Sequence, residues 1–362
     1  MMKMGKFILT LIFLTVFVSC ETENTPSNTS EANELKFISA VDISSFPEIS
    51  NTQPAFYDLK GNQSDFLTLL KSQGVNTIRL RLWVNPKNEH SSFLEVKQFS
   101  QTLKSKGFQI WLTVHYSDIW ADPSQQIIPK DWLNHSFSEL KEEVYHYTEK
   151  IIQEIEPDFV QIGNEINNGF LHPFGDIFNN HQQFLELLDT GILAVRKTSS
   201  TTKIILHYAG IKGSDWFFNE IKDLDYDIIG LSYYPIWHGK DLNALKDDLQ
   251  LLSNLYNKDI LIAETAYPFR LDWNDWTNNI VGLEEHLILP DYPATQDGQK
   301  IFIRKIKEIV KETKNGLGFC YWGAELIAWN GNKSQEGSSW ENQALFDFSN
   351  QALPVLEEFH LN

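Results

Sequence analysis

The stretch DFVQIGNE, residues 158–165, is a short apolar run that ends in polar residues, and the chain contains eight runs of this form. They begin at Phe37, Asn76, Phe108, Asp158, Lys203, Asp227, Asp259 and Gly316. Their β-branched and aromatic residues predict strands, and longer amphipathic segments separate them, which indicates repeated βα units and a parallel sheet. Eight such units close a barrel, so the sequence predicts a single (β/α)8 TIM barrel.

The segments between these runs predict helices. Residues 64–74, SDFLTLLKSQG, carry an apolar stripe, with Ser64 as the expected N-cap and Gly74 at the end. Helices are also expected over residues 93–107, 137–155 and 184–196. The alternative fold is a doubly wound sheet, but no glycine-rich phosphate turn follows the first run, where such a fold usually needs one.

Residues 1–19 predict an export signal. Lys3 and Lys6 precede an apolar run over residues 7–18 that is too short to span a bilayer. The run closes at Ser19 and Cys20, which resembles a bacterial lipobox with Cys20 as the lipidated residue; an ordinary signal peptide with a chance cysteine is the alternative. Residues 20–35 are polar and acidic, which indicates a flexible tether and resembles the surface-export signals of Bacteroidetes lipoproteins. We therefore expect a protein anchored by lipid at the outer-membrane surface, with the barrel over residues 36–362.

Composition excludes some classes of partner. The chain carries 30 Lys and Arg against 48 Asp and Glu, a formal net charge of −18. Phosphate binding needs clustered cations, so this charge argues against a nucleic acid or an anionic membrane surface as partner. The 11 Trp, 12 Tyr and 24 Phe suit sugar rings as well as an apolar core. With Cys20 lipidated, Cys320 has no intramolecular partner, so neither a disulfide framework nor a cysteine zinc cluster is expected.

Polar or aromatic residues end seven of the eight runs. They are Asp42, Ser44, Arg79, Arg81, His115, Tyr116, Ser117, Asp118, Asn164, Glu165, Tyr233, Tyr234, Glu264, Tyr321 and Trp322. In a barrel of this kind the active site lies at the carboxyl ends of the strands. One polar strand end has a simple explanation as a loop residue, whereas seven together indicate a functional site.

Glu165 and Glu264 stand out because each directly follows an apolar strand, on opposite sides of the predicted barrel mouth. Hydrolysis of a glycosidic bond uses such a pair, one carboxylic acid to protonate the departing oxygen and one carboxylate to attack the anomeric carbon. The acid needs a raised pKa, and the nucleophile needs donors that keep it ionised. Arg79 and Arg81 alternate onto one face of their strand, so either could be that donor.

Taken singly, each candidate residue could have a structural role instead of a functional one. A lone glutamate at a strand end is more often a solvated loop residue or an ion-pair partner, and only the pairing of Glu165 with Glu264 favours chemistry. His115 could be a core histidine with satisfied hydrogen bonds. The aromatic residues Tyr233, Tyr234, Trp237 and Trp322 could pack the barrel rim or form platforms for pyranose rings.

Longer strings around these residues resemble a known family. They are NTIRLRLWVNP from Asn76, HYSDIWADPSQQIIPKDW from His115, VQIGNEINNG from Val160, GLSYYPIWHG from Gly230 and ETAYPF from Glu264. Together they resemble family 53 of the glycoside hydrolases, the endo-β-1,4-galactanases that act on type I arabinogalactan and pectic galactan. The resemblance runs from about Ala40 to Phe348, so it covers nearly all of the predicted barrel.

The resemblance implies a role for each matching residue. Glu165 would be the acid/base, Glu264 the nucleophile, Asn164 the partner of the sugar 2-hydroxyl, and Arg79 the residue that orients the nucleophile. The other expected substrate-binding residues are Asp42, Arg81, His115, Asp118, Trp120, Tyr233, Trp237 and Trp322. The implied reaction is retaining double displacement on β-1,4-galactan, which requires no cofactor. We expect a monomer, because a tethered endo-enzyme has no evident need of a partner, and we assign no metal ligand.

Three segments depart from the pattern of the family. Residues 171–173 read Leu-His-Pro where Leu-Trp-Pro is common, and the run YWGAELIAW from Tyr321 replaces a frequent Glu-Pro-Ala-Trp. Some bacterial relatives bind calcium in the loop that here covers residues 270–299, whose Asp272, Asp275, Asp291 and Asp297 show no clear ligand spacing. Two rival functions are a surface lipoprotein that binds galactan without cleaving it, and an enzyme of the same clan acting on another polymer such as β-mannan.

Overall fold

The computed structural model describes residues 36–361. The predicted export signal over residues 1–19, the lipidation site at Cys20 and the tether over residues 20–35 lie outside this range and stay predictions. Within it, no helix is both long enough and apolar enough to cross a membrane.

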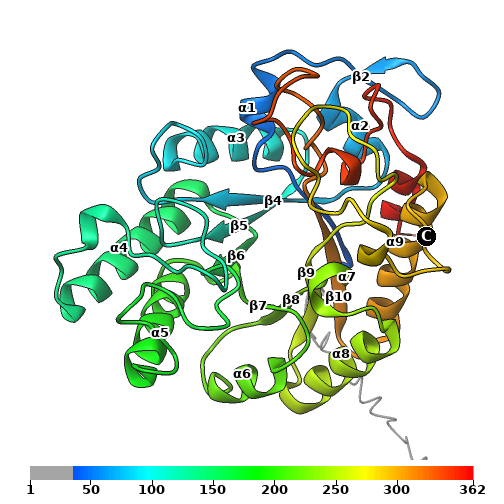
Figure 1. The fold of residues 1–362 in the computed structure, drawn as a ribbon. Coiled ribbons are helices and arrows are strands. Elements are labelled where there is room, and N and C mark those ends of the chain that lie inside the picture. Colours follow the sequence, from blue (N-terminus) through cyan, green and yellow to red (C-terminus); the bar gives the residue numbers. More distant parts are fainter. Residues whose placement is uncertain (1–35, 362) are drawn as a thin grey trace, which may run out of the picture. The chain divides into compact units, whose positions relative to one another are not determined.

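Eight parallel strands close into a barrel in the order β1-β10-β9-β8-β7-β6-β5-β4 (Figure 1). Their bounds are β1 Ile38–Asp42, β4 Thr77–Leu82, β5 Gln109–Val114, β6 Phe159–Ile162, β7 Lys203–Ala209, β8 Ile228–Ser232, β9 Asp259–Thr265 and β10 Gly316–Trp322. Each of the eight predicted runs contains one of these strands, so the predicted (β/α)8 barrel is confirmed. The two short strands β2 (Phe56–Tyr57) and β3 (Gln63–Ser64) form a separate antiparallel pair.

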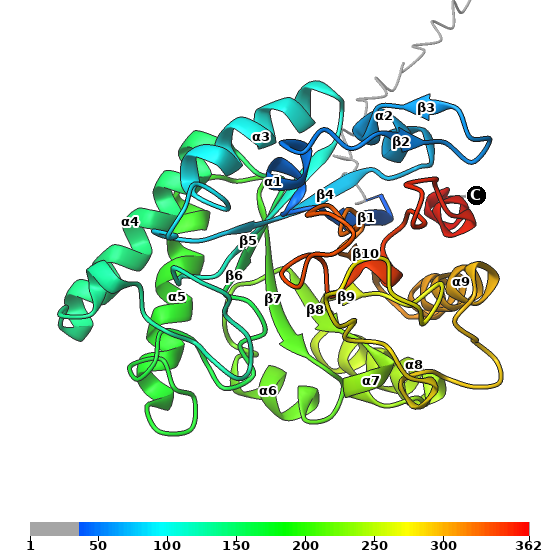
Figure 2. The same cartoon turned by 45° about the horizontal axis from the view of Figure 1, so that its top comes forward.

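Helices surround the barrel (Figure 2). The longer ones bury apolar residues along one side. Their bounds are α1 Phe46–Ser50, α2 Phe66–Ser72, α3 Phe93–Ser105, α4 Phe137–Ile155, α5 His181–Thr198, α6 Ser214–Glu220, α7 Pro235–His238, α8 Leu242–Tyr256 and α9 Gln296–Glu312. Four short 3-10 helices complete the described elements: η1 Lys130–Trp132, η2 Glu284–His286, η3 Glu341–Gln343 and η4 Pro354–Phe359.

Local capping explains where two helices begin. Helix α4 starts where predicted, because Ser136 and Glu139 form a reciprocal capping box. The predicted N-cap of α2 was wrong, because Ser64 pairs with Phe56 in the β2-β3 hairpin and the next residue, Asp65, caps the helix instead. Its carboxylate accepts the Thr68 backbone N–H at 2.8 Å.

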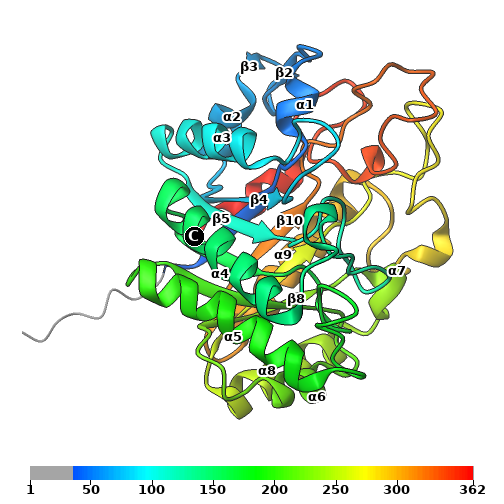
Figure 3. The same cartoon turned by 90° about the vertical axis from the view of Figure 1, so that its left-hand side faces the viewer.

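Strand register brings the polar strand ends together. Asp42 of β1 lies opposite both Arg79 of β4 and Trp322 of β10. Between β8 and β9 the register shifts, so that Ser232 faces Glu264 instead of Ala263. The long loops after the strands, including those after β5, β9 and β10, gather on the same side of the barrel (Figure 3). A site at this face is therefore built from residues far apart in the chain.

Candidate active site

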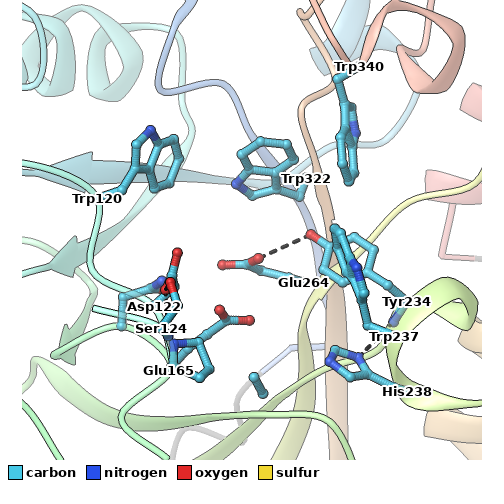
Figure 4. A pocket seen from close by; sticks show the side chains of 13 residues that line it. Trp120, Asp122, Ser124, Glu165, Tyr234, Trp237, His238, Glu264, Trp322 and Trp340 are labelled. Atoms are coloured by element: carbon cyan, nitrogen blue, oxygen red, sulfur yellow. Dashed lines mark hydrogen bonds between the residues drawn. The ribbon is translucent and has the colours of Figure 1, made fainter. Parts of the chain in front are cut away.

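Glu165 and Glu264 face each other across a cleft at the carboxyl ends of β6 and β9 (Figure 4). One carboxylate oxygen of each lies within 4.8 Å of the other and of a ring nitrogen of His207. Glu165 adopts a left-handed backbone conformation, with φ of +46°. A residue other than glycine is strained in this region, and such strain is concentrated at functional sites, where surrounding contacts hold the side chain in place.

Glu264 is nearly buried and receives two hydrogen bonds from side chains. Arg79 donates to one carboxylate oxygen at 2.8 Å, and Tyr234 donates to the other at 3.0 Å. Asp42 and Asn164 hold the same guanidinium at 2.8 and 2.9 Å. Burial raises the pKa of Glu264, and the Arg79 charge opposes that rise most strongly. Arg79 and Tyr234 thus favour an ionised Glu264.

Glu165 has a different environment, because no cation contacts it directly within the described residues. Burial and then the charge of Glu264 raise its pKa to about 8. Among residues 36–361 its one side-chain partner is Ser232, whose hydroxyl lies 2.6 Å from Oε1. When two carboxyl groups are this close and only one contacts an arginine, the proton they share resides on the other. These surroundings favour the protonated form of Glu165 near neutral pH.

Tryptophan rings form a wall of the cleft, which has a volume of about 540 Å³. Ring centroids are 5.9 Å apart for Trp120 and Trp322, 4.8 Å for Trp322 and Trp340, and 6.3 Å for Trp237 and Trp340. Trp237 keeps 54% of its surface exposed, so its ring is open to a ligand. Figure 4 shows these rings around the two carboxylates, as stacking platforms for a chain of pyranose rings would lie.

Four of the predicted substrate-binding residues line this cleft: Trp120, Asn164, Trp237 and Trp322. Arg79, for which the resemblance implies a role in orienting the nucleophile, contacts Glu264, and Asp42 holds the Arg79 guanidinium. Arg81 lies 4.2 Å from the centre of the Trp120 ring, and His115 accepts the Ala121 N–H at 3.0 Å while its ring packs on Trp120. Arg81 and His115 therefore support Trp120 from below.

The structure does not bring Asp118 or Tyr233 to the cleft. Asp118 accepts the backbone N–H groups of Asn85 and Lys130, both at 2.9 Å, and so braces two loops. The buried Tyr233 donates to the Gly239 carbonyl at 2.8 Å. Side chains alternate along a strand, so Ser232 and Tyr234 face the carboxylates while Tyr233 points away. The prediction that Tyr233 lines the groove was wrong, and Tyr234 takes that place.

Sequence reasoning missed several site residues. Ser232 and His207 contact the acid side of the pair, and Trp340 lines the cleft. The spacing of Ser232 and Tyr234 by two could have revealed Ser232, because the backbone is still extended at Tyr234, just after the end of β8. Trp340 belongs to a loop and has no local signal. His172, at the Leu-His-Pro departure, is 3.0 Å from the Asn168 carbonyl and does not line the cleft.

Glu165, His207 and Glu264 have the residue types and spacing of a metal site. However, His207 has hydrogen-bond partners at both ring nitrogens, and Glu264 contacts the Arg79 guanidinium, which repels a cation. These contacts disfavour a cation between the three side chains. In the loop over residues 270–299, both oxygens of Asp275 accept backbone N–H groups, from Thr277 and Ser338.

Glu325 lies in the YWGAELIAW departure and is buried behind Asp42. Ser45 donates its backbone N–H to Oε1 at 2.8 Å, and Oε2 has no partner among the described residues. Burial and then the Asp42 charge raise the pKa of Glu325 to about 8. This carboxyl therefore keeps its proton in the folded state over a pH range where the unfolded chain has lost it.

Glu325→Gln is expected to become progressively more stable than the wild type as pH rises from 5 to 8. The folded wild type binds more protons than the unfolded chain between the ordinary glutamate pKa and about 8, so its Glu325 contribution to stability falls as pH rises. Thermal unfolding at both pH values measures this, with the exposed Glu336→Gln as control for the charge change. A difference in melting temperature that is independent of pH would contradict it.

Cleavage of a glycosidic bond needs one carboxyl that carries a proton and one that is ionised, at about 5–5.5 Å for retention of configuration. The protein presents such a pair at the mouth of a barrel, below flat aromatic surfaces that fit sugar rings. Fold and site together define a glycoside hydrolase of the barrel type.

The chain belongs to glycosyl hydrolase family 53, whose model matches residues 38–359. An arabinogalactan endo-β-1,4-galactanase from Cellvibrio japonicus is 34% identical, over 91% of this chain and 92% of that protein. An endo-β-1,4-galactanase from Bacillus subtilis is 31% identical, over 89% of this chain and 85% of that protein. Among solved structures, the family 53 catalytic domain of Ignisphaera aggregans superposes with a TM-score of 0.84 at 40% identity, covering 90% of this chain and 96% of that one.

Proposed function

We propose that this protein is a retaining endo-β-1,4-galactanase that cleaves internal bonds of type I arabinogalactan and of pectic galactan side chains. The observation that carries the proposal is the carboxyl pair, with oxygens within 4.8 Å and only one member paired with arginine. Membership of family 53 and the printed activities of the Cellvibrio and Bacillus relatives support galactan as the substrate.

In the first step Glu264 attacks the anomeric carbon of the bound galactosyl unit. The bond to the leaving oxygen breaks as Glu165 transfers its proton to that oxygen. The Arg79 and Tyr234 donors keep Glu264 ionised and aimed. Burial raises the pKa of Tyr234 well above its usual value, so its hydroxyl stays a donor throughout. The product is a galactosyl ester of Glu264 and a shortened galactan chain.

In the second step water replaces the departed chain. Glu165, now ionised, accepts a proton from this water while the water oxygen bonds to the anomeric carbon and the ester bond to Glu264 breaks. Glu165 regains its proton and Glu264 its charge, so the enzyme returns to its starting state. Asn164 lies beside both carboxylates, where it can bind the sugar 2-hydroxyl as charge develops on the ring.

The location of the protein is a further part of the proposal. We propose export, acylation at Cys20 and attachment to the outer membrane, on the sequence of residues 1–35 alone. A monomer suffices, because the described residues of one chain supply both carboxylates and the aromatic cleft. Incorporation of a labelled fatty acid into the wild-type chain, and its absence from Cys20→Ser, tests the anchor.

Product analysis tests the activity. Wild-type enzyme is incubated with β-1,4-galactan, β-mannan and β-1,3-galactan, and the products are followed over time by chromatography and by NMR of the new reducing ends. We expect short galacto-oligosaccharides from β-1,4-galactan alone, formed first as the β-anomer. Binding without cleavage would make this a capture protein, cleavage of mannan would assign another substrate, and an initial α-anomer would rule out retention.

A further inference from the structure

Two buried residues behind Glu165 have no role in the mechanism above. His207 lies on β7, and Ser232 ends β8; both side chains are fully buried. His207 Nε2 is 2.9 Å from Ser232 Oγ, which is 2.6 Å from Glu165 Oε1. The three side chains form one hydrogen-bonded chain that ends on the acid.

The direction of hydrogen bonding along this chain follows from its other end. The backbone N–H of Glu165 points at His207 Nδ1 at 3.4 Å, which makes that nitrogen an acceptor. Gln161 Nε2 lies 3.0 Å from the same nitrogen and also donates to the Gly163 carbonyl at 3.0 Å, so the amide group is oriented as a donor. A neutral imidazole that accepts at Nδ1 carries its proton on Nε2.

His207 is held neutral by its surroundings. Burial and then the charge of Arg79 lower its pKa well below the usual value, and His115 and His238 act in the same direction. The Asn164 amide oxygen, 3.2 Å from Nδ1, already accepts from Arg79 at 2.9 Å and does not need a proton from His207. His207 therefore donates through Nε2 to Ser232, whose single hydrogen is left for Glu165 Oε1.

We propose that Ser232 and His207 are positioning residues that occupy Oε1 of Glu165 and so place its acidic proton on Oε2. Oε2 has no hydrogen-bond partner among residues 36–361. Of the three hydrogen-bonded side chains, His207, Ser232 and Glu165, only Glu165 lines the cleft. The proposal rests on the assignment of Glu165 as acid/base. Oε2 then gives its proton to the leaving oxygen and later accepts the proton of water, while the bonds within Ser232 and His207 stay intact.

The variant Ser232→Ala separates this role from a structural one. We expect kcat/KM on β-1,4-galactan to fall about 10- to 100-fold, because the acid loses its orientation. The leaving group of a 2,4-dinitrophenyl β-galactobioside needs no proton, so kcat/KM on this substrate should fall by less than about threefold. This comparison is valid because kcat/KM reports only the first step. The basic limb of the pH profile on galactan should move to higher pH, because the Ser232 hydroxyl that lowers the pKa of Glu165 is lost.

Two further variants complete the experiment. Ser232→Thr keeps the hydroxyl and should restore most of the activity on galactan. Ser253→Ala removes a buried hydroxyl from α8, on the outside of the barrel, and should leave kcat/KM on both substrates unchanged. If Ser232→Ala does not fold, His207→Gln is measured instead. Its kcat/KM should again fall more on galactan than on the dinitrophenyl substrate, but by a smaller factor than for Ser232→Ala.

Each outcome has a definite meaning. Equal losses on the two substrates would show a merely structural role, and unchanged activity on galactan would show no role, so either would overturn the inference while leaving the proposed function intact. Absence of galactan cleavage by the wild type would instead overturn the proposed function, and the inference with it.

Discussion

Glu264→Ala is expected to lower kcat/KM on β-1,4-galactan by about four orders of magnitude or more while leaving the barrel folded. The nucleophile is lost, and water alone attacks the anomeric carbon poorly. Folding should survive because Arg79 keeps its ion pair with Asp42 at 2.8 Å and its hydrogen bond to Asn164 at 2.9 Å. Initial rates and a thermal unfolding curve measure the two effects separately.

The identity of the product distinguishes a lost nucleophile from general damage. With a dinitrophenyl galactobioside and sodium azide, Glu264→Ala should form the α-galactosyl azide, because azide attacks from the space that the carboxylate occupied. Glu284→Ala, an exposed carboxylate in the loop after β9, is the control and should retain wild-type rates. Turnover of galactan by Glu264→Ala near the wild-type rate would refute the assignment of the nucleophile.

Glu165→Gln is expected to lower kcat/KM on galactan by about three orders of magnitude but to spare the dinitrophenyl substrate. The amide keeps the size of the side chain and a partner for Ser232 but has no proton to give to the leaving oxygen. In the wild type, kcat/KM should fall as pH rises through about 8, because Glu165 then loses its proton. This basic limb should be absent from the profile of Glu165→Gln.

The comparison of leaving groups is the decisive measurement for Glu165. A loss of equal size on galactan and on the dinitrophenyl substrate would show that Glu165 does not act as the acid. Retention of the basic limb in Glu165→Gln would assign that limb to another group. Glu325, whose pKa burial also raises to about 8, is the group to examine next, through Glu325→Gln.

Much of the fold followed from local sequence. The eight apolar runs each contain a barrel strand, because a strand buried on both faces is apolar along most of its length. Helix α4 spans its predicted residues because Ser136 and Glu139 satisfy its first backbone groups without help from the rest of the chain. The start of α2 was misplaced because Ser64 pairs with Phe56, a residue outside the helix.

The site was predictable where a residue type and a strand end coincide. Asn164 and Glu165 come just after β6 and Glu264 lies near the end of β9, and all three line the same cleft. Tyr233 and Tyr234 were not told apart in the sequence, because both follow the same apolar run. The structure shows that Tyr234 donates to Glu264 while Tyr233 donates to the Gly239 carbonyl. Trp340 comes from a loop about 75 residues after Glu264, and no pattern near it indicates a cleft.

The sequence by itself determined the number of βα units, the closed barrel and the two glutamates at strand ends, because each depends on residues close together in the chain. From the residues alone either Arg79 or Arg81 could contact the nucleophile, and tertiary structure decided for Arg79. It also brought Ser232 to Glu165, a contact that no sequence pattern had indicated. The difference in pKa between the two carboxyls arises from those contacts and from burial, which act through space. Two residues of one type therefore acquire different chemistry only when the barrel closes.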